Sequence, residues 1–143
     1  MLKTLTASLA LGLALTGAAA AENFDVKMLN RGDDGAMVFE PAFLQLAPGD
    51  TVTFLATDRG HNAETVPEMI PEGAEGFEGK INEEIVVTFD QEGLYGIRCK
   101  PHYAMGMVMT VAVGDIEEAP EDFLEGRIPR GAKQRFEEQL NQL

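Results

Sequence analysis

The chain has 143 residues and a formal net charge of −13 at pH 7, with 24 acidic residues against 11 basic ones. This charge argues against sequence-independent binding to nucleic acid or to anionic lipid, because both need clustered Lys and Arg side chains. The length is enough for one domain with a substantial core and hardly enough for two.

Residues 1–21 have the features of an export signal that is cleaved. Lys3 gives a short positive start, residues 9–15 form an apolar core, and residues 17–21 supply the small side chains that signal peptidase requires. The apolar stretch is too short and wrongly flanked for a membrane span, and cleavage after Ala20 or Ala21 fits equally well. We therefore predict a soluble, exported chain of residues 22–143 that forms a single domain, does not insert into a membrane, and resides in the periplasm if the host has an outer membrane.

Short strands are predicted throughout the body of the chain. Phe24, Val26 and Met28 alternate with polar residues, which is the period of a strand with one buried face. Further segments rich in β-branched or aromatic residues follow, each bounded by turn signals, at 37–40, 43–46, 51–57, 84–89, 94–99 and 108–113. Seven short strands at this spacing predict an all-β fold, a β-sandwich with Greek-key connections.

Two segments depart from the strand pattern. Between Asn62 and Asn82 the strand pattern lapses, and the stretch PEMIPEGAEGFEGK, residues 67–80, is rich in proline, glycine and glutamate, which predicts a long surface loop. From about residue 120 a helical spacing replaces the alternation, with apolar residues at Ala132, Phe136, Leu140 and Leu143. This tail is expected to form one or two C-terminal α-helices that pack their apolar stripe on the sandwich.

The scarcest side chains lie in two short segments. Cys99 is the only cysteine, and His61 and His102 are the only histidines. Cys99 and His102 belong to the stretch CKPHYAMGM, residues 99–107, which also holds Met105 and Met107. A tight loop between two predicted strands would bring these side chains together, and His61 can join them because the loops of a sandwich gather at its ends.

Four uses of the single thiol are open at this point. Cys99 can form an intermolecular disulfide, stay buried and inert, act as a nucleophile, or bind a metal as a thiolate. Two imidazoles, one thiolate and one thioether match the preferences of copper, because soft sulfur atoms favour Cu(I) while imidazole suits both oxidation states. Zinc would accept the same histidines and thiolate, but it has no redox chemistry and usually takes a harder fourth ligand. The residue types therefore favour a copper site suited to electron transfer.

The motif Cys-x-Pro-His-x₄-Met, with a lone upstream His-Asn pair, resembles the blue copper proteins, or cupredoxins, and most of all the pseudoazurin family. The resemblance extends over essentially all of residues 22–143, including residues 28–54, GHNAET, INEE and YGIRCKPHYAMGM. It implies a cupredoxin-like sandwich with a helical tail at about residues 120–143. It also implies one type 1 copper ion, bound by His61, Cys99, His102 and Met107. The choice of Met107 over Met105 rests on the family spacing, in which the axial sulfur lies eight residues after the cysteine.

The resemblance also implies roles for residues around the copper site. Asn62 would link the loops that carry the ligands by hydrogen bonds. Pro101 has no N–H, so the thiolate sulfur would accept one hydrogen bond fewer. An apolar rim around the exposed edge of His102, where the electron passes, would be formed by Met105, Pro101 and Met37.

Basic residues near the predicted copper site indicate how a redox partner could bind. In the pseudoazurin family a ring of lysines surrounds the copper end and meets acidic partners; here arginines replace some of them, at Arg31, Arg59 and Arg98, beside Lys100. The alternative is that these are only solvated charges. A surface that is basic at the copper end and acidic elsewhere would orient the chain toward an acidic redox enzyme.

The resemblance therefore implies a monomeric periplasmic electron carrier, not an enzyme, that alternates between Cu(II) and Cu(I). In pseudoazurin-like proteins the acceptor is often a copper nitrite reductase and sometimes nitrous oxide reductase, with cytochromes as donors, which would place the chain in denitrification. One rival is an oxidoreductase related to nitrite reductase, which would need a second metal centre although both histidines are already used. The other is a copper storage or delivery protein, which would favour an open, Met- or Cys-rich Cu(I) site.

Overall fold

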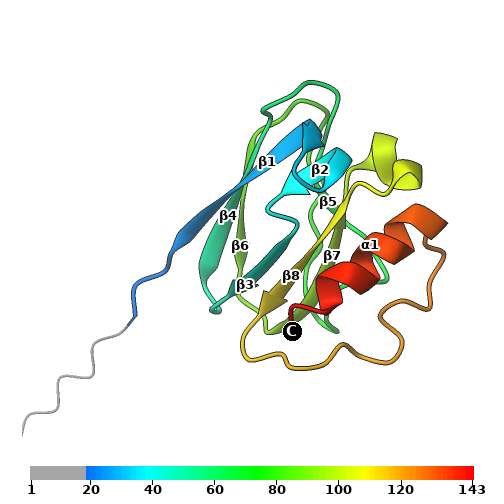
Figure 1. The fold of residues 1–143 in the computed structure, drawn as a ribbon. Coiled ribbons are helices and arrows are strands. Elements are labelled where there is room, and N and C mark those ends of the chain that lie inside the picture. Colours follow the sequence, from blue (N-terminus) through cyan, green and yellow to red (C-terminus); the bar gives the residue numbers. More distant parts are fainter. Residues whose placement is uncertain (1–18) are drawn as a thin grey trace, which may run out of the picture.

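Two four-stranded sheets pack face to face in the computed structural model, which describes residues 19–143 (Figure 1). The predicted export signal, residues 1–21, lies almost entirely outside the described residues. The strands are β1 (Asn23–Gly32), β2 (Gly35–Glu40), β3 (Phe43–Leu46), β4 (Asp50–Leu55), β5 (Glu64–Thr65), β6 (Ile85–Phe89), β7 (Gly93–Arg98) and β8 (Val108–Val113).

The order of the strands within the sheets confirms the predicted sandwich. The first sheet has the order β2-β1-β4-β6 and the second has the order β3-β8-β7-β5. The pairs β1–β4 and β3–β8 are parallel, whereas the other pairs are antiparallel. All seven predicted strands are present, and most begin and end within two residues of the predicted bounds.

The core lies between the two sheets and follows from the alternation of the strands. Val26 and Met28 of β1 and Val52 and Phe54 of β4 are fully buried, while their neighbours in sequence face outward. The ring of Phe54 meets that of Phe39 from β2 edge to face at 6.2 Å, a geometry that aromatic pairs prefer.

The strand β8 is buried along all six of its residues, so it does not show the alternation of a half-exposed strand. Met109, Val111 and Val113 face the core between the sheets, whereas Val108 and Ala112 belong to a second apolar cluster. A strand that is covered on both faces reads as a continuous apolar run. The cover on the second face is the C-terminal helix.

A single α-helix, α1 (Arg130–Leu140), forms the tail, with its apolar stripe on the sandwich as predicted. Ala132 and Phe136 are fully buried, and Leu140 and Leu143 pack against the same cluster. The possible second helix is absent from the described tail: residues 121–124 form turns, and the helix begins only after Pro129. No helix among residues 19–143 is long and apolar enough to cross a membrane.

The segment between Asn62 and Asn82 has two parts: residues 67–80 form the predicted loop and are mostly exposed, whereas the residues before them are buried. All residues from His61 to Val66 are buried, and Glu64 and Thr65 form the short strand β5 beside β7. Burial of these polar side chains is possible because distant partners satisfy them: Thr65 Oγ1 accepts a hydrogen bond from the N–H of Phe77 at 3.0 Å. The sequence pattern contains no sign of partners supplied by the tertiary fold.

Candidate metal centre

Three side chains from separate parts of the chain converge on one point: His61, Cys99 and His102. The Nδ1 atoms of the two histidines are 3.1 Å apart, and Cys99 Sγ lies 3.6 Å from the first and 3.5 Å from the second. A point equidistant from the three atoms lies about 2.0 Å from each, close to the metal–nitrogen and metal–sulfur bond lengths of about 2.0–2.3 Å in zinc sites. The three donors therefore fit a single metal ion.

The orientation of His61 is fixed by Asn30, at the end of β1. His61 is fully buried, and its Nε2 lies 2.8 Å from Asn30 Oδ1. Because an amide oxygen only accepts, Nε2 carries the proton, and in the neutral ring the lone pair of Nδ1 faces the cluster. Burial first, and then the nearby His102, lower the pKa of His61, against a smaller opposing effect of Asp58. The ring is thus held neutral, as metal binding requires.

Sequence reasoning did not find Asn30. It is an ordinary polar residue near the end of a predicted strand, and it lies 31 positions before the histidine that it contacts. Only the parallel pairing of β1 with β4 brings the end of β1 to the loop that carries His61.

The segment 99–107, which we call the ligand loop, closes the end of the β7–β8 hairpin (Figure 1). Its middle forms a short 3₁₀ helix, η1 (Lys100–Met105), where a tight loop was predicted. The N–H of Cys99 donates to the carbonyl of Met107 at 3.0 Å, and the N–H of Met107 donates to the carbonyl of His102 at 3.1 Å. These bonds hold the backbones of the three residues together whether or not a metal is bound.

The two methionines of the ligand loop have opposite environments. Met107 is fully buried next to the cluster of three donors, whereas the side chain of Met105 is 55% exposed. Burial therefore favours the same thioether, Met107, that the family spacing favours.

The Cys99 sulfur is buried and closed to other protein molecules. Its residue is 0% exposed, so it cannot reach a second chain, and the alternative of an intermolecular disulfide loses its support. Burial raises the pKa of the Cys99 thiol, and Glu64 adds to this, while backbone N–H groups of Asn62 and His102 oppose the shift. A thiol that resists ionisation is a poor free nucleophile, whereas a bound cation would stabilise the thiolate directly.

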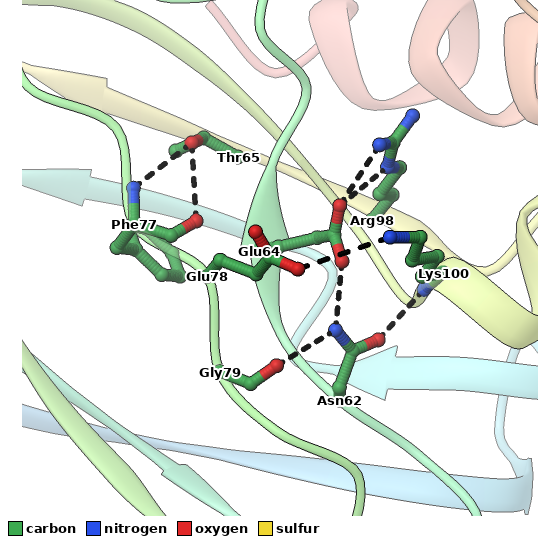
Figure 2. A network of polar contacts seen from close by, with 8 residues as sticks. All are labelled: Asn62, Glu64, Thr65, Phe77, Glu78, Gly79, Arg98 and Lys100. Atoms are coloured by element: carbon green, nitrogen blue, oxygen red, sulfur yellow. Dashed lines mark hydrogen bonds and ion pairs between the residues drawn. The ribbon is translucent and has the colours of Figure 1, made fainter.

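The side chain of Asn62 connects the loop that carries His61 to the ligand loop (Figure 2). Its Oδ1 accepts a hydrogen bond from the N–H of Lys100 at 2.7 Å, and its Nδ2 donates to the carbonyl of Gly79 and to Glu64 Oε1. Because both donors and the acceptor are used, the amide has one orientation. Asn62 thereby ties together the residues that follow His61 and Cys99 in sequence.

Two of the four predicted docking cations are engaged in ion pairs (Figure 2). Arg98 donates from Nε and Nη2 to the buried Glu64 carboxylate, at 3.0 and 2.8 Å. Lys100 Nζ lies 3.8 Å from Glu78 in an exposed pair. Arg98 is therefore part of the interior network beside Cys99, and its charge is largely cancelled at a distance.

The other predicted docking residues lie around the metal centre in different degrees of exposure. Arg31 and Arg59 are exposed, and within residues 19–143 they form no ion pair. Arg31 follows Asn30, and Arg59 lies two residues before His61, so both are at the metal end. Pro101 is exposed beside the partly exposed His102, whereas Met37 is partly buried against the core.

Comparisons with known proteins agree with this geometry. Residues 26–114 match the family described as copper binding proteins, plastocyanin/azurin family. The chain is 44% identical over 140 residues to the pseudoazurin of Paracoccus pantotrophus, covering 98% of this chain and 97% of that one. It is 53% identical over 109 residues to the pseudoazurin of Methylorubrum extorquens, covering 76% and 74% of the two chains.

Solved structures show the same relationship. The crystal structure of pseudoazurin from Methylobacterium extorquens AM1 superposes with a TM-score of 0.79 at 44% identity, covering 84% of this chain and 98% of that one. Native pseudoazurin from Hyphomicrobium denitrificans gives a TM-score of 0.76 at 39% identity, covering 85% and 98%. The cluster of His61, Cys99 and His102, with the buried Met107 beside it in the ligand loop, thus resembles a type 1 copper site.

Proposed function

This chain belongs to the plastocyanin/azurin family of copper-binding proteins, and within it to the pseudoazurins, and from this we propose that it is a one-electron carrier whose single copper ion is bound by His61, Cys99, His102 and Met107. The observation that carries the proposal is the triangle of two Nδ1 atoms and one Sγ, with edges of 3.1 to 3.6 Å. Copper supplies the ability to accept and return one electron, because this mixture of soft and intermediate donors suits both of its oxidation states.

The chain's own contribution is to hold the donors still. Asn30 fixes the ring of His61, Asn62 ties the two loops together, and the hydrogen bonds between Cys99 and Met107 close the ligand loop. Donors that keep their positions without the ion need little rearrangement when the charge at the site changes. Pro101 lacks an N–H and would therefore leave the sulfur with fewer hydrogen bonds, which tunes the reduction potential.

Electrons would enter and leave through the partly exposed edge of His102. Met105 and Pro101 beside it are exposed, so a partner can dock closely there and exclude water. Arg31 and Arg59 at the same end would orient an acidic redox protein. The burial of His61, Cys99 and Met107 supports electron transfer over copper storage or delivery, which would favour an open, Met- or Cys-rich Cu(I) site.

The biological setting follows from the pseudoazurin family and is proposed here for this chain. After removal of residues 1–21, the single domain of residues 22–143 would act in the periplasm as a monomer. Its acceptor would be a copper nitrite reductase or nitrous oxide reductase and its donor a cytochrome, as in denitrification. An enzymatic role would need a second metal centre, and among residues 19–143 the three donors above form the one cluster of this kind.

One spectrum tests the proposal. The chain loaded with Cu(II) should absorb intensely at about 600 nm, from charge transfer between thiolate and copper, and should bleach on reduction. Cys99→Ser should lose this band, whereas the control Met109→Leu, a core change in β8, should keep it. A colourless protein that binds only zinc or Cu(I) would overturn the proposal.

A further inference from the structure

Arg135 of α1 donates hydrogen bonds to backbone carbonyls of two other segments, the ligand loop and the start of β2. Its Nη1 donates to the carbonyl of Gly106 at 2.9 Å and to that of Met37 at 2.6 Å, and its Nη2 donates to the carbonyl of Ala36 at 2.8 Å. One guanidinium thus joins three segments that are far apart in sequence: the helix, the ligand loop and the start of β2. A planar fork of donors makes such a set of contacts, which a lysine ammonium cannot reproduce.

The contact at Gly106 lies in the part of the ligand loop between His102 and Met107, two of the proposed copper ligands. Gly106 separates Met107 from the end of η1, and its φ of +89° is a conformation that glycine adopts readily. A Cβ at this position would come within 3.1 Å of the Gly131 carbonyl oxygen and 3.3 Å of Arg135 Cδ. The end of the ligand loop is therefore packed tightly on the first turns of α1.

The contact at Met37 holds an unusual backbone conformation. Met37 has a φ of +53°, which is sterically disfavoured for a residue with a side chain. Such a conformation persists only where surrounding structure fixes it. The hydrogen bonds that Arg135 donates to the carbonyls of Ala36 and Met37 supply that fixation.

We propose that Arg135 is a positioning residue for electron transfer, because it clamps the ligand loop against α1 and β2 and so limits its movement when the charge at the site changes. The inference rests on the proposed electron-carrier function. The clamp belongs to the protein alone, since every contact in it joins Arg135 to a backbone carbonyl. It can therefore be tested with and without copper.

The first experiment measures amide hydrogen exchange in the metal-free chain. In Arg135→Met the N–H groups of Gly106 and Met107 should exchange at least about tenfold faster, because charge-assisted hydrogen bonds that oppose opening of the loop are lost. In Arg135→Lys the exchange rates of these amides should lie between those of the unmodified chain and those of Arg135→Met. Arg130→Met, which removes an exposed arginine from the same helix, should leave these amides unchanged. Phe136→Leu, which weakens the packing of the helix, should accelerate exchange across α1 without singling out Gly106 and Met107.

The second experiment measures the electron self-exchange rate and the reduction potential of the copper-loaded variants. Arg135→Met should retain the band near 600 nm but show slower self-exchange than Arg130→Met and Phe136→Leu, because a loop that is no longer clamped moves more when the charge at the site changes. Its potential should be lower than that of Phe136→Leu, since a positive charge that disfavours Cu(II) is gone. Unchanged amide exchange at Gly106 and Met107 would overturn the clamp itself. Faster amide exchange with unchanged self-exchange and potential would make Arg135 a purely structural residue and would also overturn the proposal. A chain that never develops the band would instead refute the carrier function, and the metal-free result would still stand.

Discussion

The side-chain oxygen of Asn30 accepts a hydrogen bond from Nε2 of His61 at 2.8 Å, and this contact determines which nitrogen of the buried ring faces the metal centre. Asn30 belongs to β1, whereas His61 lies in the loop that follows β4. A hydrogen bond of this kind both orients a histidine ligand and sets its tautomer.

Replacing Asn30 with alanine should therefore weaken copper binding. Loss of an outer hydrogen bond to a histidine ligand typically lowers metal affinity by about 10–100-fold. Competition with a copper chelator would measure this. Asn23→Ala is a matched control, because Asn23 lies at the other end of β1 and bonds only with surface groups of Asp25, Thr51 and Thr53. An affinity for Asn30→Ala equal to that of this control would contradict the role of Asn30.

The Arg98–Glu64 ion pair should stabilise the fold. Arg98→Met would leave the buried Glu64 carboxylate with Asn62 as its remaining partner, and should lower the free energy of unfolding by about 2 kcal/mol. Adding Glu64→Gln to this variant should recover part of the loss, since the unpaired charge is then removed. Chemical denaturation would measure both variants.

The exposed pair of Lys100 with Glu78 provides the control for this prediction. Its side chains are 64% and 72% exposed and lie 3.8 Å apart, so Lys100→Met should change stability by less than about 0.5 kcal/mol. Equal losses in Arg98→Met and Lys100→Met would show that burial of Glu64 does not matter.

Reversing the charge of Arg59 or Arg31 should slow association with an acidic redox partner. Both side chains are exposed at the metal end, and steering by such charges raises association rates at low ionic strength. Stopped-flow kinetics over a range of salt concentrations would measure the effect, which should fade as the charges are screened. Lys27→Glu makes the same charge change in the middle of β1. A rate that does not fall with added salt, in the unmodified chain, would argue against steering altogether.

The exposed side chain of Met105 should matter for partner contact and not for the metal. Met105→Lys places a hydrated charge on the apolar rim, so electron exchange with a partner should slow while the band near 600 nm remains. Val86→Lys is the matched control, because Val86 is also an exposed apolar residue, at 64% against 55% for Met105, but lies on β6. Equal exchange rates in the two variants would remove Met105 from the docking surface.

Much of the fold could be predicted from local patterns. The strands and the stripe of α1 follow from periodicity, because each side chain's burial depends mainly on its own strand or helix face. The short strand β5 could not be predicted in this way. Its residues are polar, and burial of the Glu64 carboxylate depends on Arg98, which reaches it from β7.

The candidate site likewise has residues that the local sequence indicates and residues that only the tertiary fold brings to the site. The scarcity of cysteine and histidine and the spacing of Cys99, His102 and Met107 point to a copper site. Asn30 and Arg135 carry no such signal, because each acts on a segment that is distant in sequence. Equally, the sequence showed Arg98 only as a charge near Cys99, while its pairing with Glu64 depends on how β5 lies beside β7.

The burial of β8 on both faces has a consequence for folding. The core between the sheets and the cluster under α1 share this one strand, through Met109 and Val111 on one face and Ala112 on the other. Release of the helix would expose one face of β8 to water, and opening of the sandwich would expose the other. The two clusters should therefore unfold together, in one cooperative transition in which the helical tail does not melt first.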